Sequence, residues 1–371
     1  MPYRFLIGTY TRPARLASGA VRAGHGAGIL LAEWDPSSGH PACRPLARTP
    51  ANPSFLARSA DVRRVYAVRE TGGSVPGPGF PSDPSGAVAT FAAEGPLRRI
   101  ALRSMGGADP CHISVDPEGS CLLVTNYTGG SVSLHPLDAA GNPTGRRRLL
   151  RLPSDGLGPN RARQEGPHPH AAVFSPDGRY VLVPDLGRDA VLVFRLDRTA
   201  LRLREVGRYA APPGSGPRHL AFHPTLPVAY LVHELDSTLS ALRFDPAAGT
   251  LAPLRTLSTL PPGFSGSSTA ADVRITPDGR FLYVSNRGAD SLAAFALDAD
   301  GLPRPVGSHP SGGRTPRSFA ISGDGACLLA ANQDGDSLVV FAIDPADGRL
   351  ARRAEVAAGT PTHVLALQSI N

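Results

Sequence analysis

Four residues of this sequence could together activate water: His170, Arg218, Glu234 and Arg287. A neutral imidazole or a carboxylate can take a proton from water, and a guanidinium offers a rigid fork of donors to an oxygen anion. Hydrolysis beside an anionic substrate is the chemistry that such a set would serve. Polar residues close to these four in the sequence pattern are candidates for substrate binding, namely Gln164, His168, His219, Asn286, Arg317, Asn332 and Gln333.

The spacing of these residues follows an internal repeat. One unit recurs along the chain, as in PHAAVFSPDGRYVLVPDL from Pro169 and AADVRITPDGRFLYVSNR from Ala270. Within each unit, two apolar segments flank a turn such as SPDG, which predicts a β-hairpin. The copies begin at Pro53, Pro110, Pro169, Pro217, Ala270 and Pro316, with a truncated seventh at Pro361. Successive starts lie between 45 (316 to 361) and 59 residues (110 to 169) apart, which is the size of a propeller blade.

A third apolar segment follows each hairpin, as in DAVLVFRLD at Asp189, and the N-terminal part supplies the seventh as GILLAEWD at Gly28. The N-terminal RFLIGTY has no first strand before it, and the C-terminal PTHVLAL has no second strand after it. Pairing these two would complete one blade and leave no free sheet edge. We therefore predict an all-β, single-domain protein over residues 1–371, with seven four-stranded antiparallel blades and a ring closed by the N- and C-terminal strands.

An antiparallel hairpin places the start of its first strand beside the end of its second strand, so the repeat predicts rings of residues around one mouth. The first ring contains Ser54, Cys111, His170, Arg218, Ala271, Arg317 and Thr362, and the position after it adds His112, His219, Asp272 and His363. The second ring contains Thr9, Glu70, Asn126, Asp185, Glu234, Asn286 and Asn332, with Arg287 and Gln333 following. For Asn126 and Asp185 we favour capping of backbone groups. The longest predicted loops, 11–27, 71–85 and 153–167, open on the same face and favour a binding site there.

The composition limits the partners and the chemistry. All 38 basic residues are arginine, which excludes a lysine Schiff base, and a net charge of +7 suits a small anionic substrate. Arginine runs such as 146–148 lack interleaved aromatic residues, so we predict no nucleic-acid partner. Four cysteines without metal spacing, no signal-peptide pattern and no long apolar run predict a cytoplasmic protein without a membrane partner. With no exposed apolar strand in the pattern, we expect a monomer or a weak homodimer.

Several motifs extend over nearly the whole chain: GTYT at Gly8, RQEGPHPH ending at His170, GPRHLAFHP from Gly216, HEL at His233, PDGRFLYVSNRG from Pro277, GRTPRSFAI from Gly313 and AANQ at Ala330. In these stretches the chain resembles the lactonase family of seven-bladed β-propellers, which includes 6-phosphogluconolactonase and the carboxy-muconate lactonising enzyme. The resemblance implies a catalytic cluster at His170, Arg218, Glu234 and Arg287 and no metal or other cofactor. Asp272 and Ala289 depart from the family pattern, which expects a glutamate and a histidine there.

The resemblance implies a carboxylic ester hydrolase that opens a sugar lactone, above all 6-phosphoglucono-1,5-lactone of the pentose phosphate pathway. In our hypothesis Glu234 or His170 is the general base and Arg218 stabilises the oxyanion, while Arg287, Arg317, Gln164 and Gln333 orient the sugar and its phosphate. The muconate branch of the family, a lyase or isomerase reaction, is one alternative, and a scaffold without catalysis is another.

Two metal sites are further alternatives. A transition metal would use His168, His170, His219, His223 and His233. A calcium ion would use Glu70, Asn126, Asp185, Glu234 and Asn286, because oxygen ligands suit that ion.

Overall fold

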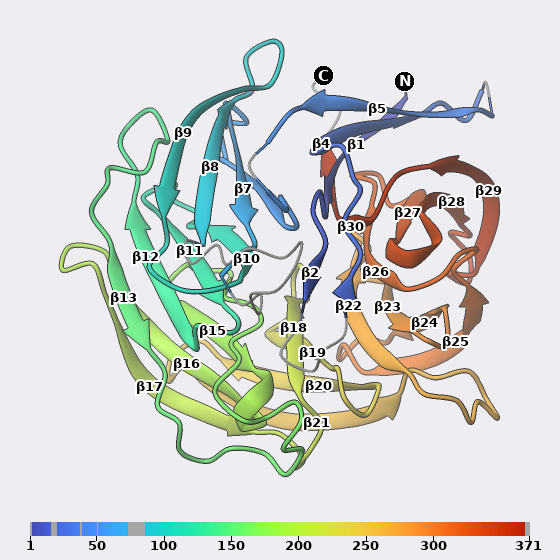
Figure 1. Cartoon of the computed structure of the whole chain (residues 1–371). Coiled ribbons are helices and arrows are strands. Elements are labelled where there is room, and N and C mark those ends of the chain that lie inside the picture. Colours follow the sequence, from blue (N-terminus) through green and yellow to red (C-terminus); the bar gives the residue numbers. More distant parts are fainter. Residues whose placement is uncertain (1, 16–20, 38, 50, 73–85, 368–371) are drawn as a thin grey trace.

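The computed structural model describes residues 2–15, 21–37, 39–49, 51–72 and 86–367. These residues form seven four-stranded antiparallel sheets arranged in a ring, together with one two-stranded hairpin (Figure 1). The predicted seven-bladed propeller is therefore confirmed. The predicted loops 11–27 and 71–85 lie partly outside the described residues, since positions 16–20 and 73–85 are not among them.

Each blade has four strands from the axis outward, in sequence order in six blades, while the seventh has the C-terminal strand innermost. The innermost strands are β6 (Leu56–Arg58), β10 (Pro110–Val115), β14 (Val173–Phe174), β18 (Pro217–Phe222), β22 (Thr269–Ile275), β26 (Pro316–Ile321) and β30 (Pro361–Leu367). The second strands are β1 (Tyr3–Thr9), β7 (Arg64–Arg69), β11 (Cys121–Asn126), β15 (Tyr180–Asp185), β19 (Val228–His233), β23 (Phe281–Arg287) and β27 (Cys327–Asn332).

The third strands are β4 (Ile29–Trp34), β8 (Ala87–Ala92), β12 (Ser131–Pro136), β16 (Ala190–Asp197), β20 (Thr238–Asp245), β24 (Ser291–Leu297) and β28 (Ser337–Ile343). The outer strands are β5 (Pro41–Ala47), β9 (Arg98–Ser104), β13 (Arg148–Arg151), β17 (Arg202–Ala210), β21 (Thr250–Ser258), β25 (Pro303–Pro310) and β29 (Leu350–Ala357).

The ring closes as the sequence predicts. The C-terminal β30 pairs antiparallel with the N-terminal β1, with Ile7 opposite Val364, and this blade has the order β30-β1-β4-β5. The strands β1 and β30, from opposite ends of the sequence, lie side by side in this blade (Figure 1). Closure leaves each innermost strand facing the axis and each outer strand facing solvent.

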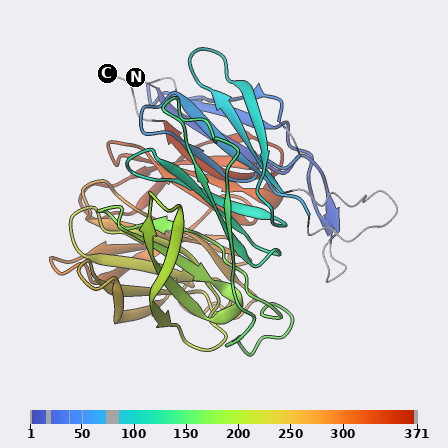
Figure 2. The same ribbon diagram turned by 90° about the vertical axis from the view of Figure 1, so that its left-hand side faces the viewer.

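The sequence did not predict three short elements. The hairpin β2 (Ala14–Arg15) and β3 (Val21–Arg22) projects from one face of the ring (Figure 2). The 3-10 helices η1 (Leu186–Arg188) and η2 (Gln333–Gly335) connect second to third strands. Within the described ranges, no helix is long and apolar enough to cross a membrane.

The hydrophobic core lies between the blades. Each of seven buried clusters joins the second strand of one blade to that of its neighbour, as where Val181 and Val183 of β15 share a cluster with Leu123 of β11. Both faces of these strands are covered, which explains their continuous runs of valine, leucine and alanine.

The turns define two faces of the ring. In each blade, one turn joins the first strand to the second and another joins the third strand to the fourth. These turns lie on one face of the ring, which we call the rear face. Its turns are short and hydrogen-bonded, as where Asp278 binds the hydroxyl of Thr276 and the amide of Arg280. Tyrosines on second strands bind the next blade's turn there: the Tyr230 hydroxyl donates to the Gly301 carbonyl and Tyr283 to that of Gly348, both at 2.7 Å.

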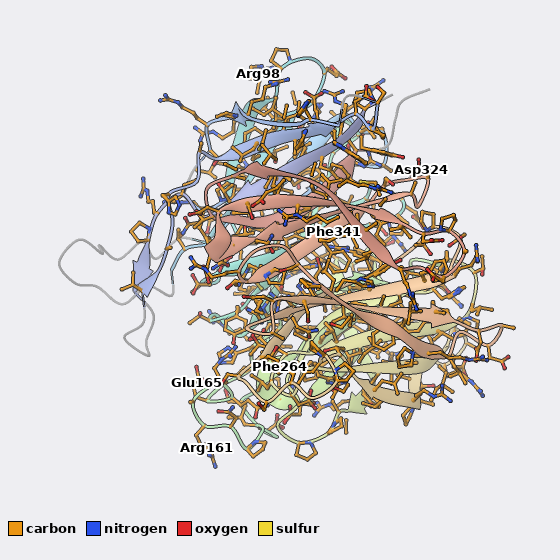
Figure 3. The ribbon with its side chains drawn as sticks, turned by 90° about the vertical axis from the view of Figure 1, so that its right-hand side faces the viewer. Arg98, Arg161, Glu165, Phe264, Asp324 and Phe341 are labelled. Atoms are coloured by element: carbon orange, nitrogen blue, oxygen red, sulfur yellow. The ribbon has the colours of Figure 1, made fainter. Side chains whose placement is uncertain are left out.

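The other connections lie on the opposite face, which we call the mouth face. Figure 3 shows Arg161 and Glu165 of one such connection on one side of the ring and Asp324 of a rear turn on the other. Asp189, with a positive φ of 47°, accepts the amides of Gly214 and Gly216 through its carboxylate. This contact holds the loop that leads into β18, and so fixes the first residues of that strand at the mouth.

Candidate active site

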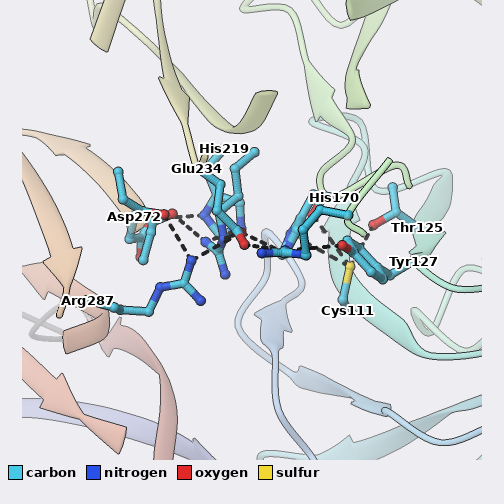
Figure 4. A network of polar contacts seen from close by, with 12 residues as sticks. Cys111, Thr125, Tyr127, His170, His219, Glu234, Asp272 and Arg287 are labelled. Carbon is cyan, nitrogen blue, oxygen red and sulfur yellow. Dashed lines mark hydrogen bonds and ion pairs between the residues drawn. The ribbon is translucent and has the colours of Figure 1, made fainter. Parts of the chain in front are cut away.

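The mouth face carries a buried carboxylate surrounded by guanidiniums. Glu234 follows β19, and its carboxylate lies 2.9 Å from Arg218 Nε, 3.1 Å from Arg287 Nη2 and 2.5 Å from Arg163 Nη2 (Figure 4). Arg218 is the second residue of β18 and Arg287 the last of β23, whereas Arg163 comes from the loop between β13 and β14. Three neighbouring parts of the ring therefore converge on one carboxylate.

The charges of this cluster are set by burial and by their mutual contacts. Burial opposes ionisation of Glu234, but Arg287, Arg163 and Arg218 outweigh it and hold the pKa of this carboxyl well below its usual value. Burial and the neighbouring Arg287 lower the pKa of Arg218 to about 10, which still leaves it charged at neutral pH. Glu234 is therefore an anion at neutral pH and keeps its charge beside its three guanidinium partners.

His170 lies beside this carboxylate. Its backbone amide is held by the Pro184 carbonyl, and its Nε2 lies 4.0 Å from Glu234 Oε2. Burial, followed by the charge of Arg218, places the pKa of His170 well below 6.5, so the imidazole is neutral at neutral pH. A neutral imidazole can accept a proton, and the nearby carboxylate would stabilise the resulting cation.

Arg218 is buried beneath Glu234, with only 2% of its side chain exposed. Its Nη1 binds the Ala271 carbonyl and lies 3.3 Å from His219 Nε2. Since a guanidinium only donates, His219 Nε2 is the acceptor and its Nδ1 donates to Asp272 at 3.1 Å. Burial opposes ionisation of Asp272, but Arg274 and His219 keep the pKa of this carboxyl low. His219 and Asp272 thus orient Arg218.

The side chains that reach the open mouth are Arg287 and Arg163, with exposed fractions of 15% and 38%. Arg317 extends over the ring of Tyr10, at 5.4 Å from its centroid. His168 stacks on Tyr127 at 4.4 Å and contacts Glu165. Arginine side chains therefore form the accessible part of the site, and buried aromatic rings such as Tyr10 and His168 support them.

Four of the predicted substrate-binding residues are engaged within the protein. The side chain of Gln164 donates from Nε2 to the Leu186 carbonyl and accepts the backbone amide of Asn160 at Oε1. Asn286 binds Thr259 and Ser291, while Asn332 binds Ser337 and the Ser311 carbonyl. Gln333 Nε2 donates to Asp334. Of these four, Gln164, Asn286 and Asn332 are fully buried.

The structure brings six of the seven first-ring residues together and divides the second ring. These six line a small cavity on the axis: Ser54, Cys111, His170, Arg218, Arg317 and Thr362. His112 and His363, which we predicted beside the first ring at the mouth, line a different cavity at the opposite end of the axis. The second ring combines two adjacent strand positions, whose side chains point in opposite directions. One position turns into its own blade, where Asn126, Asn286 and Asn332 bind the serine opposite them on the third strand, and His233 binds Ser240. The other position contains Tyr10, Glu70, Tyr127, Glu234 and Arg287, which contact one another or members of the first ring. It also contains Leu186, which is fully buried, and Gln333, which binds Asp334.

Sequence reasoning missed three residues of the site. Tyr10 donates to Glu70 at 3.0 Å, and Tyr127 lies 3.4 Å from Arg163 Nη2 while its ring meets that of His170. Separating the two strand positions would have revealed both tyrosines. Arg163 lies in a non-repeating loop, so no periodic signal marks it.

The axial cavity between the rings is about 10 Å³, the space of a single water molecule. A sugar lactone would not fit there, so a substrate of that size would bind above Glu234, against Arg163 and Arg287. Part of the predicted histidine group lies elsewhere, since His223 binds the Gly279 carbonyl and His233 binds Ser240. Among the described residues, no three or more His, Cys, Asp or Glu side chains are arranged to hold a metal ion.

The residues proposed as a calcium cage do not converge either. Asp185 accepts the amides of His168 and Gly187, and Asn126 binds Ser131 and Ser133. Glu70 binds Tyr10 and Ser54. These contacts support the interpretation that Asn126 and Asp185 satisfy local polar groups.

Comparisons with known proteins agree with this architecture. The family model described as "Lactonase, 7-bladed beta-propeller" matches residues 4–366. A 6-phosphogluconolactonase of Bacillus subtilis is 32% identical over 295 residues, covering 79% of this chain and 77% of that protein. The solved structure of a periplasmic gluconolactonase of Pseudomonas aeruginosa has a TM-score of 0.86 at 33% identity and covers 99% of both chains. A protein of Lactobacillus plantarum has a TM-score of 0.87 at 29% identity, covering 99% of this chain and all of its own.

Proposed function

Because the chain belongs to the lactonase family of seven-bladed β-propellers, we propose that it hydrolyses 6-phosphoglucono-1,5-lactone to 6-phosphogluconate. The observation that supports this most directly is the neutral His170 beside Glu234, whose carboxylate contacts three arginines at the mouth. The site therefore offers a base that can take a proton from water, and cations that can stabilise a developing oxyanion and an anionic substrate.

In the proposed reaction, His170 Nε2 takes a proton from water as the water oxygen attacks the lactone carbonyl carbon. The charge that develops on the carbonyl oxygen is stabilised by Arg287, and the imidazolium is stabilised by Glu234. The tetrahedral intermediate then breaks its bond to the ring oxygen, which takes the proton back from His170. The carboxylic acid so formed releases a proton to solvent.

This assignment changes two roles in the sequence-based hypothesis. Arg218 is buried, and its Nε and Nη1 are used by Glu234, Ala271 and His219. We therefore assign to Arg218 the positioning of Glu234, and to Arg287 the contact with the carbonyl oxygen.

The phosphate is assigned to the accessible guanidinium of Arg163, together with Arg317. A guanidinium matches two phosphate oxygens at once, which a neutral hydroxymethyl group could not use. The name of the Bacillus subtilis relative supports a phosphorylated lactone, whereas the Pseudomonas aeruginosa protein is called a gluconolactonase. A phosphorylated sugar substrate would place the enzyme in the cytoplasm, which is part of this proposal.

The decisive experiment measures hydrolysis of freshly prepared 6-phosphoglucono-1,5-lactone, glucono-1,5-lactone and a carboxy-muconate. We expect the phosphorylated lactone to have the highest kcat/KM. Glu234→Gln is expected to lower that value by about 10²- to 10⁴-fold, since it removes the charge that stabilises protonated His170. Glu205→Gln, on an exposed outer strand, is the matched control and should retain full activity.

Each other result would change the proposal. Equal turnover of both gluconolactones, unchanged in Arg163→Met, would remove the phosphate from the assignment. Turnover of the muconate alone would select cyclisation in place of hydrolysis. No turnover of any of the three would favour a binding scaffold.

A further inference from the structure

The rear face contains a second cavity on the axis. It has a volume of about 610 Å³ and is surrounded by all seven innermost strands. Its walls are mainly aliphatic, from side chains such as Ile113, Val173, Leu220, Ile275, Ile321 and Leu365. We call this cavity the rear channel. Its volume is typical of pockets that hold a small molecule.

A layer of rings separates the rear channel from the mouth. Phe55 lines both the rear channel and the small axial cavity under the mouth. The Phe55 ring packs against His363 and His112, with centroids 3.7 and 4.5 Å apart. Since the axial cavity beyond this layer holds no more than one water, the rear channel is a blind pocket.

The floor of this pocket offers hydrogen-bond donors. His112 Nδ1 accepts the Ala172 amide at 3.4 Å, and His363 Nδ1 accepts the Leu56 amide at 3.2 Å. Burial lowers the pKa of both imidazoles well below 6.5, so each ring is neutral and carries its proton on Nε2. Neither Nε2 has a hydrogen-bond partner among the described residues, although His112 and His363 are only 9% and 2% exposed.

Two arginines add positive charge to the wall. Arg58, at the end of β6, is half-buried, and no carboxylate or other hydrogen-bond partner contacts its guanidinium within the described part of the chain. Arg274 donates from Nη2 to Asp272 at 3.2 Å, but its Nε is buried without a partner among the described residues. With neutral histidines and one carboxylate, the pocket keeps an excess of one positive charge.

We propose that the rear channel binds a small organic anion with an apolar body, of the class of medium-chain carboxylates. The carboxylate would lie toward Arg58 and Arg274, within reach of the histidine donors, and the hydrocarbon would lie along the aliphatic walls. A purely apolar molecule would leave the hydrogen-bond donors of the pocket without partners, and a small inorganic anion would leave its aliphatic walls in contact with water. A ligand with both a charged group and a hydrocarbon body avoids both costs. This inference does not depend on the proposed lactonase activity.

The test uses octanoate as the probe and isothermal titration calorimetry of the full-length protein. We expect one binding site for octanoate and binding at least about tenfold weaker for octan-1-ol, which lacks the charge. Arg58→Met and His112→Phe, which keep the apolar volume, should each weaken octanoate binding by about tenfold. Arg58→Lys should retain most of the affinity because it keeps the charge.

Two matched controls locate the site. Arg44→Met changes the neighbouring groove that Arg58 also borders, and it should leave octanoate binding unchanged. Glu234→Gln, at the mouth, should also leave it unchanged. Thermal denaturation of every variant establishes that it is folded.

Four results would overturn the proposal. The first is that octanoate does not bind to the folded wild-type protein, which would mean that the channel holds only solvent. The second is that octan-1-ol binds as well as octanoate. The third is that Arg58→Met and His112→Phe bind octanoate as the wild type does. The fourth is that Glu234→Gln abolishes binding, which would place octanoate at the mouth.

Discussion

The two ends of the propeller axis are built from the same seven strands but carry different chemistry. At the mouth, strand ends and one long loop bring Glu234, Arg287 and Arg163 into contact. At the rear, the same strands present aliphatic side chains around a blind channel whose polar groups, Arg58 among them, have few partners within the described residues. At the mouth three guanidiniums share one carboxylate, whereas at the rear no carboxylate contacts Arg58 within the described residues.

This contrast follows from the connections. Rear turns are short and use their own side chains for hydrogen bonds, as Ser175 and Asp177 do, so they add nothing to the axis. Mouth connections are free to be long, and the loop 153–167 delivers Arg163 across the ring to Glu234. Function on a rigid scaffold therefore depends on the face where loop length varies.

The sharpest test of the contrast compares two buried, neutral histidines on neighbouring innermost segments, His170 and His112. His170→Asn should lower kcat/KM for the lactone by about 10²- to 10⁴-fold, because the proposed base is lost. His112→Asn should leave it within about twofold, since His112 belongs to the layer of rings and lines the rear channel, not the small axial cavity under the mouth. Steady-state kinetics measure both, and equal losses would mean that the two ends are not independent.

The next comparison replaces one arginine at each end of the axis, and it should lower kcat/KM only at the mouth. Arg287→Met should lower kcat/KM by about 10- to 100-fold, because a charge-assisted contact to the substrate and one to Glu234 are removed. Arg58→Met should leave kcat/KM unchanged. If Arg287→Met changes only the thermal stability and not the kinetics, its contact with the carbonyl oxygen is refuted.

The rear face should contribute more to stability than to activity. Tyr283→Phe removes a buried hydrogen bond of 2.7 Å between neighbouring blades and should lower the free energy of unfolding by about 1 kcal/mol. Urea denaturation measures this change, and the lactone kinetics should stay as in the wild type. Tyr3→Phe, whose bond to Asp324 is exposed, is the matched control and should lose less.

The ring of blades could be predicted because every copy of the repeat carries its own turn and its own apolar strands. The same regularity located the residues that meet at the mouth, including His170 and Glu234. It did not give the direction of each side chain at a strand end. Asn286 turns into its blade toward Ser291, while the next residue, Arg287, reaches Glu234.

Features outside the repeat could not be predicted in this way. Arg163 and the hairpin β2–β3 lie in loops without periodicity, and their positions depend on contacts formed only in the folded ring. The burial of Arg218 could not be predicted either, because it results from contacts with Glu234, Ala271 and His219 that form only in the folded ring. A repeat predicts where backbone positions lie, and loops decide which of them solvent can reach.

The smallest expected effect concerns pH, and it tests whether burial sets the properties of the mouth. The proposed base must be neutral, so activity is lost as pH falls through the pKa of His170. Burial and Arg218 place that pKa well below 6.5, so kcat/KM for enzyme-catalysed hydrolysis should change by less than about twofold between about pH 6 and 8. An exposed histidine would instead lose about half of the activity near pH 6.5. A pH profile of kcat/KM, corrected for spontaneous lactone hydrolysis, distinguishes a buried from an exposed His170. A midpoint near pH 6.5 would show that solvent reaches His170 and that the mouth is more open than its geometry indicates.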